Sequence, residues 1–191
     1  MASVLRPGGV LAVAELNAAR LDGELFAVDE AFAPVDEVDD TRLRAAALLE
    51  LIGTRLIAEL DSALWIHGIR TLPPALHRVC VSRSDRLKFA PSPRFVMREV
   101  THSRYDVERV GELRVTAPAR ILFDLSVLGG DQTSRDAAAL IERWPHLAAE
   151  CVARVEEAPN LPGKIAALAR LRGWMAEAGE TRQPALTRYT S

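Results

Sequence analysis

A dense group of arginines gives the chain its clearest chemical signal. Residues 77–120 hold ten basic side chains, nine of them arginine, against five carboxylates. The guanidinium group presents a planar fork of N–H donors that fits phosphate and the guanine edge bidentately. We therefore predict DNA contacts at Arg78, Arg83, Arg86, Lys88, Arg94, Arg98, Arg104, Arg109 and Arg114. An alternative stays open, because strand alternation also places such arginines on a solvated face, balanced by the acids between them.

Catalytic and cofactor motifs are missing from the sequence. It contains neither of the glycine-rich nucleotide motifs, no G-x-S-x-G and no H-E-x-x-H. A nuclease of the carboxylate type needs an acid-x-lysine pair, which neither Lys88 nor Lys164 supplies. We therefore expect a non-enzymatic protein with no catalytic residue, cofactor or metal. An inactive nuclease-like domain is kept as a further alternative.

The four histidines do not form a ligand motif. They stand in separate segments, at His67, His77, His102 and His146. A metal site would need long-range assembly. His67 follows an apolar pair near the end of an expected helix, so we interpret it as a packed, hydrogen-bonded core histidine. A Ser-His-Asp assembly is defined in space, and no pattern in the sequence points to one.

The composition is that of a globular protein. Hydrophobic residues make up 49% of the 191 residues and charged residues 26%. The longest apolar runs, such as Ala45 to Leu49, are too short to span a bilayer, so no membrane contact is expected. No leader-like segment opens the sequence, and Cys80 and Cys151 lie far apart. We expect a reduced, cytoplasmic protein.

Charge is distributed unevenly along the chain. Residues 1–76 carry a net charge of −6, residues 77–120 carry +5 and residues 121–191 carry −1. Eight carboxylates and no basic residue lie between Asp22 and Asp40. The basic segment could meet phosphate or an acidic protein surface, whereas the acidic segment would repel DNA.

Elements of both kinds must position these side chains, so we expect an α+β fold. Helices are expected at 10–21, 41–51, 63–67, 118–128, 134–144, 147–157 and 161–175. Strands are expected at 25–28, 31–35, 55–60, 77–82, 95–100, 107–110 and 113–115. Asp40 is a good N-cap for the second helix, with Gly53 just beyond its end. Arg120 and Asp124 have the i, i+4 spacing of an ion pair within one helix.

Three segments of the sequence form a familiar series: Ser62 to Ile69, Thr101 to Arg104 and Leu113 to Leu125, the last being the most specific. Together they resemble the AbiEi family of antitoxins and transcriptional regulators of type IV toxin–antitoxin systems, common in actinobacteria. The resemblance covers about residues 40–175. It implies a winged helix-turn-helix before a mixed α/β antitoxin domain, and partners that are the protein's own operator DNA and a cognate toxin. It carries over no catalytic residue.

The N-terminal segment departs from that family pattern. Room exists for one helix and a small hairpin, and Arg6 and Arg20 are the only basic residues before Arg42. We interpret residues 1–40 as a shortened, acidic winged-helix remnant, 41–178 as the antitoxin-like domain and 179–191 as a polar tail. The acidic segment could shield the basic one, mimic a nucleic-acid backbone or dock on a basic toxin. A protein-interaction module without DNA binding is the alternative function.

Overall fold

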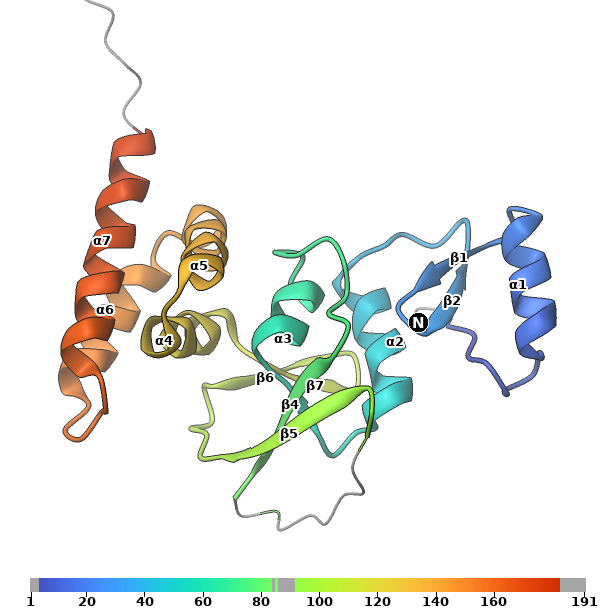
Figure 1. Ribbon diagram of the computed structural model, residues 1–191, viewed down its shortest axis with the longest axis horizontal. Helices are drawn as coiled ribbons and strands as arrows, with labels where there is room; N and C mark the ends of the chain where they lie inside the picture. The colour runs from blue at the N-terminus through green and yellow to red at the C-terminus, as the bar shows by residue number, and fades with distance from the viewer. Residues whose placement is uncertain (1–3, 84, 86–91, 183–191) are drawn as a thin grey trace, which may run out of the picture. The chain divides into compact units, whose positions relative to one another are not determined.

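The computed structural model describes residues 4–83, 85 and 92–182, which form helices and strands as far as Thr116 and helices alone from Pro118 on (Figure 1). The fold is α+β, as predicted. The chain divides into two compact units, Met1–Ala117 and Pro118–Ser191. This division falls inside the segment 41–178 that the sequence suggested as one domain.

The first unit begins with a helix beside a small hairpin. The helix α1 (Val13–Leu21) lies against β1 (Leu25–Val28), which pairs antiparallel with β2 (Ala31–Pro34), as Figure 1 shows. Leu5 forms an isolated antiparallel bridge with Phe32. The hairpin was predicted correctly. One helix, one hairpin and this bridge are what stands before Asp40 in the described residues, and the winged-helix interpretation stays a prediction.

The apolar stripe predicted for the first helix does not form a buried face. Leu16 is fully buried, but Val10 and Leu21 are 95% and 80% exposed. The reason is that α1 packs mainly against the single narrow strand β1, which covers one line of side chains. Periodicity identified an apolar side of the helix, but the first unit provides no surface to cover most of it.

The helix α2 (Thr41–Ile52) begins and ends as its capping residues predicted. The Asp40 side chain accepts the backbone N–H groups of Arg42 and Leu43, at 2.8 and 2.9 Å. Gly53 follows the last turn with φ +72°, which a residue with a Cβ rarely adopts. These two local signals explain the accurate prediction, because each acts within a few residues.

A five-stranded mixed sheet forms the centre of the first unit. Its strands are β3 (Ile57–Ala58), β4 (His77–Ser82), β5 (Phe95–Val100), β6 (Val107–Val110) and β7 (Leu113–Thr116), in the order β5-β4-β3-β7-β6. β3 pairs antiparallel with β4 and parallel with β7. β4 and β5 are parallel, and β6 and β7 form an antiparallel hairpin.

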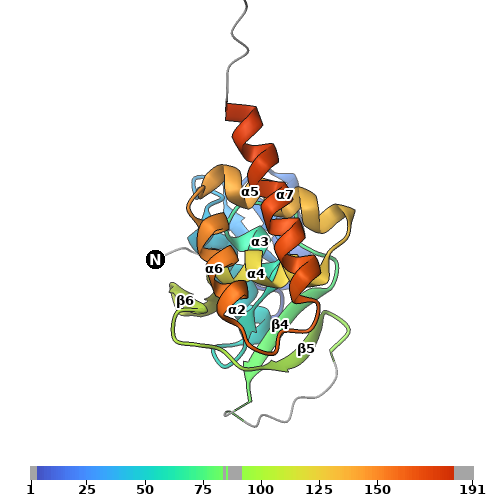
Figure 2. The ribbon, with the colours of Figure 1, turned by 90° about the vertical axis from the view of Figure 1, so that its left-hand side faces the viewer.

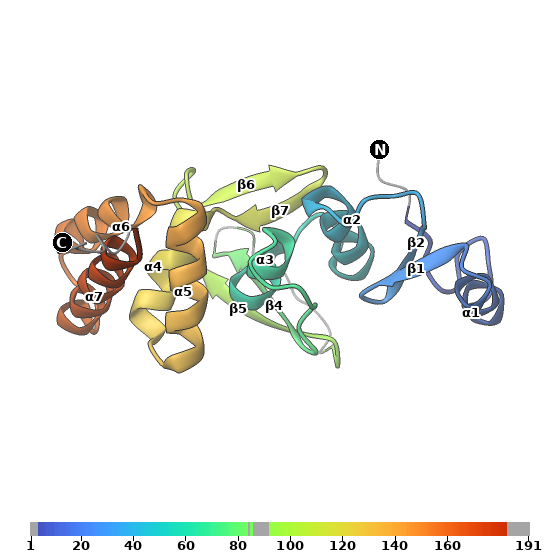
Figure 3. The same ribbon diagram turned by 90° about the horizontal axis from the view of Figure 1, so that it is seen from above.

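Two helices cover one face of this sheet. α3 (Leu60–Ile66) packs against β4 and β7, and α2 packs against β6 and β7 (Figure 3). Leu113 and Val115 of β7 are fully buried on this side, whereas Arg114 between them is partly exposed on the other. The opposite face of the sheet therefore carries no helix of the first unit.

The start of α3 differs from the prediction. The helix begins at Leu60 rather than near Ala63, and the preceding strand is confined to Ile57–Ala58. Glu59 stands at the N-cap position but makes no side-chain cap hydrogen bond. Its carboxylate binds a distant arginine instead, described below. The Glu59 carboxylate is thus used in a long-range ion pair rather than in a local cap.

The second unit is helical. It contains α4 (Pro118–Leu128), α5 (Asp131–Arg143), α6 (Leu147–Glu157) and α7 (Lys164–Arg182), with α6 and α7 side by side (Figure 2). α5 begins three residues before the predicted Ser134. The predicted pair of Arg120 and Asp124 forms at 3.1 Å with both residues 8% exposed. No helix among the described residues is long and apolar enough to cross a membrane.

The last helix buries a different line of residues from the one predicted. Ile165 and Met175 are 86% and 39% exposed, while Ala167, Leu171 and Trp174 are buried. The helix also runs on to Arg182, into the segment predicted as a polar tail; residues 183–191 of that segment lie outside the described residues. The sequence suggested Ile165, Leu168, Leu171 and Met175 as the apolar side, and Leu171 is buried as expected. The helical period was therefore correct, but the buried side is rotated from the expected one.

A glycine next to an arginine ends α4, and replacing it should destabilise the second unit. Gly129 has φ +70°, and a Cβ there would lie 2.5 Å from the Arg170 guanidinium carbon. That guanidinium donates to the Ser126 carbonyl at 2.6 Å. We expect Gly129→Ala to lower the free energy of unfolding by about 1–3 kcal/mol, through backbone strain and a disturbed hydrogen bond. Urea unfolding followed by circular dichroism measures the change.

Gly173→Ala is the matched control for that substitution. Gly173 lies within α7, and a Cβ there would meet no atom within 4 Å. Alanine has the higher helix propensity, so this variant should keep or raise the stability. Equal unfolding midpoints for both variants would contradict the role given to Gly129 and Arg170.

Candidate nucleic-acid interface

Nine basic residues were predicted to contact DNA. Four of them lie on the face of the sheet that carries no helix of the first unit. The strand register places Arg109 opposite Arg114, Arg114 opposite Ile57, Ile57 opposite Cys80, and Cys80 opposite Arg98. Residues that face each other across neighbouring strands point to the same side. Arg78 stands two residues before Cys80 and joins them. We call this set, Arg78, Arg98, Arg109 and Arg114, the arginine face.

Arg98 is engaged by a buried carboxylate. Its Nε and Nη2 atoms donate to the two Glu59 carboxylate oxygens at 2.6 and 2.7 Å, a bidentate pair. Glu59 is 2% exposed, whereas the Arg98 side chain is 46% exposed. A carboxylate removed from water needs such a partner, because its desolvation is costly. Leu60, next to Glu59, has φ +47°, an unusual value for a residue with a side chain. Arg98 therefore stabilises the fold at this point.

Arg109 and Arg114 form a like-charge pair. They lie directly opposite each other on β6 and β7, an arrangement that destabilises an antiparallel pair. Arg114 donates to the Arg55 carbonyl and lies 3.8 Å from the Asp85 carboxylate. The exposed Arg109 side chain makes no hydrogen bond or ion pair to another described residue. An anion bound beside these two arginines would relieve their repulsion.

The other residues predicted to bind DNA either make weak surface contacts or lie outside the arginine face. Arg78 lies 3.8 Å from Asp61, which is also 3.3 Å from Arg70, so this is a loose surface pair. Arg83 is exposed just after β4. Arg104 stacks on its neighbour Tyr105. Arg86 and Lys88 lie outside the described residues.

Arg94 is not part of the arginine face. It binds the turn of the β1–β2 hairpin, with Nη2 3.2 Å from the Asp29 carboxylate and Nε against Glu30. It also donates to the Ala75 carbonyl at 2.7 Å. The sequence placed Arg94 in a DNA-binding segment because no local pattern signals a partner 65 residues away. In the structure it connects the hairpin to the segment before β5.

A buried chain of hydrogen bonds continues from the same hairpin turn. Asp29, with its side chain 5% exposed and φ +56°, lies 2.9 Å from His77 Nε2. His77 Nδ1 is 3.0 Å from Ser62 Oγ, which in turn accepts the Arg78 backbone N–H at 2.9 Å. These partners are all satisfied when Ser62 donates to Nδ1 and Nε2–H donates to Asp29.

No pattern in the sequence indicated this Ser-His-Asp set, and its geometry does not suit catalysis. Ser62 and His77 are both completely buried, so a substrate has no path to the hydroxyl. The Ser62 oxygen is also occupied by a backbone donor. The chain of hydrogen bonds acts as a structural connection between the hairpin, α3 and β4. The Asp-Glu turn was visible in the sequence as a turn, but its long-range partners were not.

At least four of the eight carboxylates in the acidic segment bind other groups of the protein. Asp29 and Glu30 bind Arg94, and Asp40 caps α2. The Asp39 carboxylate accepts a hydrogen bond from Arg44 at 2.7 Å, which lowers the pKa of Asp39. The negative surface charge that could repel DNA or contact a partner is therefore smaller than the count of eight carboxylates suggests.

Titratable groups elsewhere offer no built catalytic centre. Cys151 is buried, and this burial raises its pKa to about 12, so it is a thiol at neutral pH. Cys80 is also buried, with Sγ 3.2 Å from His102 Nε2. Among the described residues, no three His, Cys, Asp or Glu side chains are arranged to hold a metal ion.

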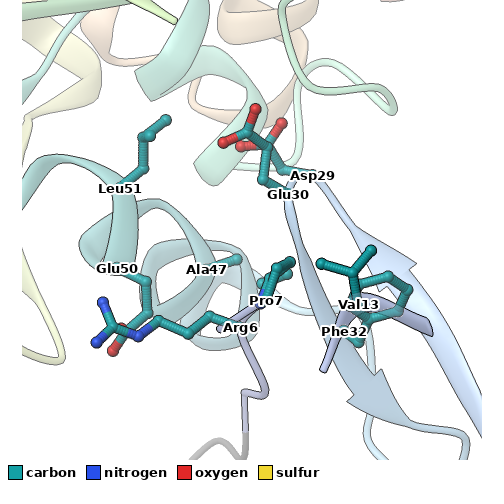
Figure 4. A pocket seen from close by; sticks show the side chains of 10 residues that line it. Arg6, Pro7, Val13, Asp29, Glu30, Phe32, Ala47, Glu50 and Leu51 are labelled. Atoms are coloured by element: carbon teal, nitrogen blue, oxygen red, sulfur yellow. The ribbon is translucent and has the colours of Figure 1, made fainter. Parts of the chain in front are cut away.

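A pocket of about 470 Å³ opens between α2 and the hairpin (Figure 4). Arg6 and Glu50 point toward one another on one side, 3.4 Å apart, and Phe32 and Val13 lie on another. Glu30, near the top of the view, is already paired with Arg94. The described lining of this pocket is partly apolar and carries Arg6 and three carboxylates, Asp29, Glu30 and Glu50, and it contains no serine, threonine or cysteine.

Comparisons with known proteins do not identify a family for this chain. No protein-family model and no curated protein matches this sequence. Among solved structures the chain is similar to the RV2827C protein from Mycobacterium tuberculosis, with 14% identity and a TM-score of 0.45. The match covers 87% of this chain and 65% of that protein, so the chain spans about two thirds of its length. A likeness this distant carries no argument about function.

Loss of the Asp29 charge should loosen the hairpin. Asp29→Asn keeps the side-chain shape and tolerates the positive φ, but it weakens the bonds to His77 and Arg94. We expect the free energy of unfolding to fall by about 1–3 kcal/mol, measured by urea unfolding. Asp36→Asn, on an exposed neighbour in the same segment, should change it by less than about 0.5 kcal/mol. Equal losses in the two variants would contradict the structural role of Asp29.

His67 should make stability depend on pH. It is 8% exposed, with Nε2 3.0 Å from the Thr116 carbonyl, which confirms the expected core histidine. Burial lowers its pKa from the ordinary value of 6.5. Neutral His67 therefore stabilises the fold above pH 6.5, and this contribution is lost as pH falls from 6.5 toward the lowered pKa, since the unfolded chain binds the proton first.

The variant His67→Gln isolates this effect. Glutamine can still donate to the Thr116 carbonyl but does not titrate. The unfolding free energy of the wild-type protein should fall more steeply between pH 7 and pH 5 than that of the variant. Parallel curves would show that His67 does not contribute to the pH dependence.

Proposed function

We propose that this chain is a non-enzymatic, antitoxin-like transcriptional regulator that binds DNA through the arginine face. The observation that supports the proposal most is the register of β6 and β7, which places Arg109 directly opposite Arg114 on the face of the sheet that carries no helix of the first unit. Arginines at strand spacing could match neighbouring phosphates, because both repeat at a few ångströms.

The energetics of the individual arginines favour a site at the β6–β7 side of this face. Arg109 and Arg114 repel each other in the free protein, and a phosphate beside them would replace that repulsion by attraction. The loose pair of Arg78 and Asp61 is partly exposed and can be exchanged for a phosphate contact with little loss. The Arg98–Glu59 pair is different, because releasing Arg98 would leave a buried carboxylate without its partner.

The acidic segment opposes DNA binding less than its composition implied. Asp29, Glu30 and Asp39 are neutralised by arginine, and the Asp40 carboxylate accepts the N–H groups at the start of α2. The interpretation of this segment as an arm that docks on a toxin is weakened for the same reason. The toxin partner rests on the resemblance in sequence, and a cytoplasmic location rests on the positions of the two cysteines.

Arg109→Ala tests the proposal most simply. Fluorescence anisotropy with the upstream DNA of the gene and a scrambled duplex, over a range of salt, gives the affinity and its salt dependence. Losing one phosphate contact should weaken binding and reduce the slope of log affinity against log salt by about one. The exposed Arg109 makes no contact that folding requires, and its removal relieves the repulsion from Arg114, so the variant should be at least as stable as the wild-type protein.

Arg42→Ala is the matched control, because Arg42 is an exposed arginine on α2, which covers the opposite face of the sheet. It should bind DNA as the wild-type protein does. Equal effects of both substitutions would remove the arginine face from the mechanism. Absence of binding to either duplex at low salt would contradict the proposal and favour the protein-interaction module.

A further inference from the structure

An exposed tyrosine stands on the segment that passes over the arginine face. Tyr105 is 72% exposed, an unusual state for a large aromatic side chain in a folded unit. Three residues earlier, His102 Nε2 contacts Cys80 Sγ at 3.2 Å, and Cys80 lies in the cross-strand row between Ile57 and Arg98. The segment 101–106 is therefore anchored to the same face as the arginines.

The turn that carries Tyr105 is well fixed. The Asp106 carboxylate accepts the Ser103 backbone N–H at 2.8 Å, and the Asp106 N–H donates to the Ser103 carbonyl at 3.1 Å. Asp106 is 1% exposed, so its carboxylate is held inside the fold. The Ala117 N–H, next to the end of β7, binds the Asp106 carbonyl at 2.9 Å. Tyr105 thus projects from a turn bonded to itself and to the sheet.

Arg104 holds the tyrosine ring. Its guanidinium carbon lies over the ring, 4.6 Å from the centroid, and Nη2 donates to the Tyr105 hydroxyl. The ring remains 72% exposed with this guanidinium over it, so most of its surface is open to solvent. A fixed aromatic ring joined to a cation is a stacking platform, since a base can stack on the ring while a phosphate meets the guanidinium.

We propose that the ligand of the arginine face is nucleic acid with at least one unpaired base, which stacks on Tyr105. Bases inside a regular duplex already stack on each other, so an exposed ring gains a partner only where a base is unstacked. Arginines along the sheet would follow the backbone of the same strand. This inference rests on the proposed function and deepens it, because it names the form of nucleic acid that the site recognises.

The experiment compares one sequence in single-stranded and duplex form, using the full chain and the variants Tyr105→Ala, Tyr105→Phe and Arg109→Ala. A 2-aminopurine base in the single strand reports stacking through quenching of its fluorescence. We expect Tyr105→Ala to weaken single-strand binding about tenfold, to change duplex binding little and to abolish the quenching. Tyr105→Phe keeps the ring and should retain most of the affinity and the quenching. Because Tyr105 is exposed, the substitutions should leave the protein folded, and circular dichroism checks this.

The outcomes separate this inference from the function beneath it. If Tyr105→Ala binds the single strand with wild-type affinity, or quenches the probe as the wild-type protein does, the stacking site is overturned. If Arg109→Ala still weakens duplex binding in that case, the DNA-binding function is unaffected. Failure of the wild-type protein to bind either form at low salt would overturn both. Stronger binding of the duplex than of the single strand, with no effect of Tyr105→Ala on either, would also overturn the inference alone.

Discussion

Burial of two carboxylates determines which arginines of this protein are structural. Glu59 and Asp29 both lie inside the first unit, where an unpaired negative charge would destabilise the fold strongly. Arg98 reaches Glu59 across the sheet, and Arg94 and His77 reach Asp29 in the hairpin turn. These contacts connect the hairpin, α3, β4 and β5 into one unit. They also remove two arginines from the set that can engage a ligand.

The arginine face follows from the remaining constraint, which is the alternation of side chains in a sheet covered on one side. Apolar residues of β7 point to α2 and α3, so the arginines between them must point the other way. Arg109 and Arg114 thereby come to lie directly opposite each other, without a carboxylate between them in the register. The alternation of side chains along each strand thus brings arginines of four consecutive strands, β4 to β7, to one face of the sheet.

Local features were predictable from the sequence, and long-range ones were not. The β1–β2 and β6–β7 hairpins and the Asp40 cap depend on neighbours a few residues apart, and each was found. The buried faces of α1 and α7 were predicted only in part, because periodicity reveals an apolar side without showing which surface will cover it; Leu16 and Leu171 are buried, but much of each apolar side is exposed. Arg94 was misplaced for a related reason, since its partners, Asp29 and Glu30, belong to another segment.

The site could be predicted in part. Counting charge along the chain identifies the basic segment, but only pairing in three dimensions separates Arg109 from Arg98. The Ser62–His77–Asp29 set shows the converse, because residue types that suggest catalysis come together in a completely buried structural role. Burial and donor direction, rather than residue identity, decide between these interpretations.

The most direct test of this account is the NMR spectrum of the arginine side chains, recorded through their Nε–Hε signals during titration with DNA. The account predicts that the signals of Arg109 and Arg114 shift on binding, while those of Arg94 and Arg44, held by Asp29 and Asp39, stay in place. Shifts at Arg94 and Arg44 with none at Arg109 and Arg114 would contradict binding through the arginine face.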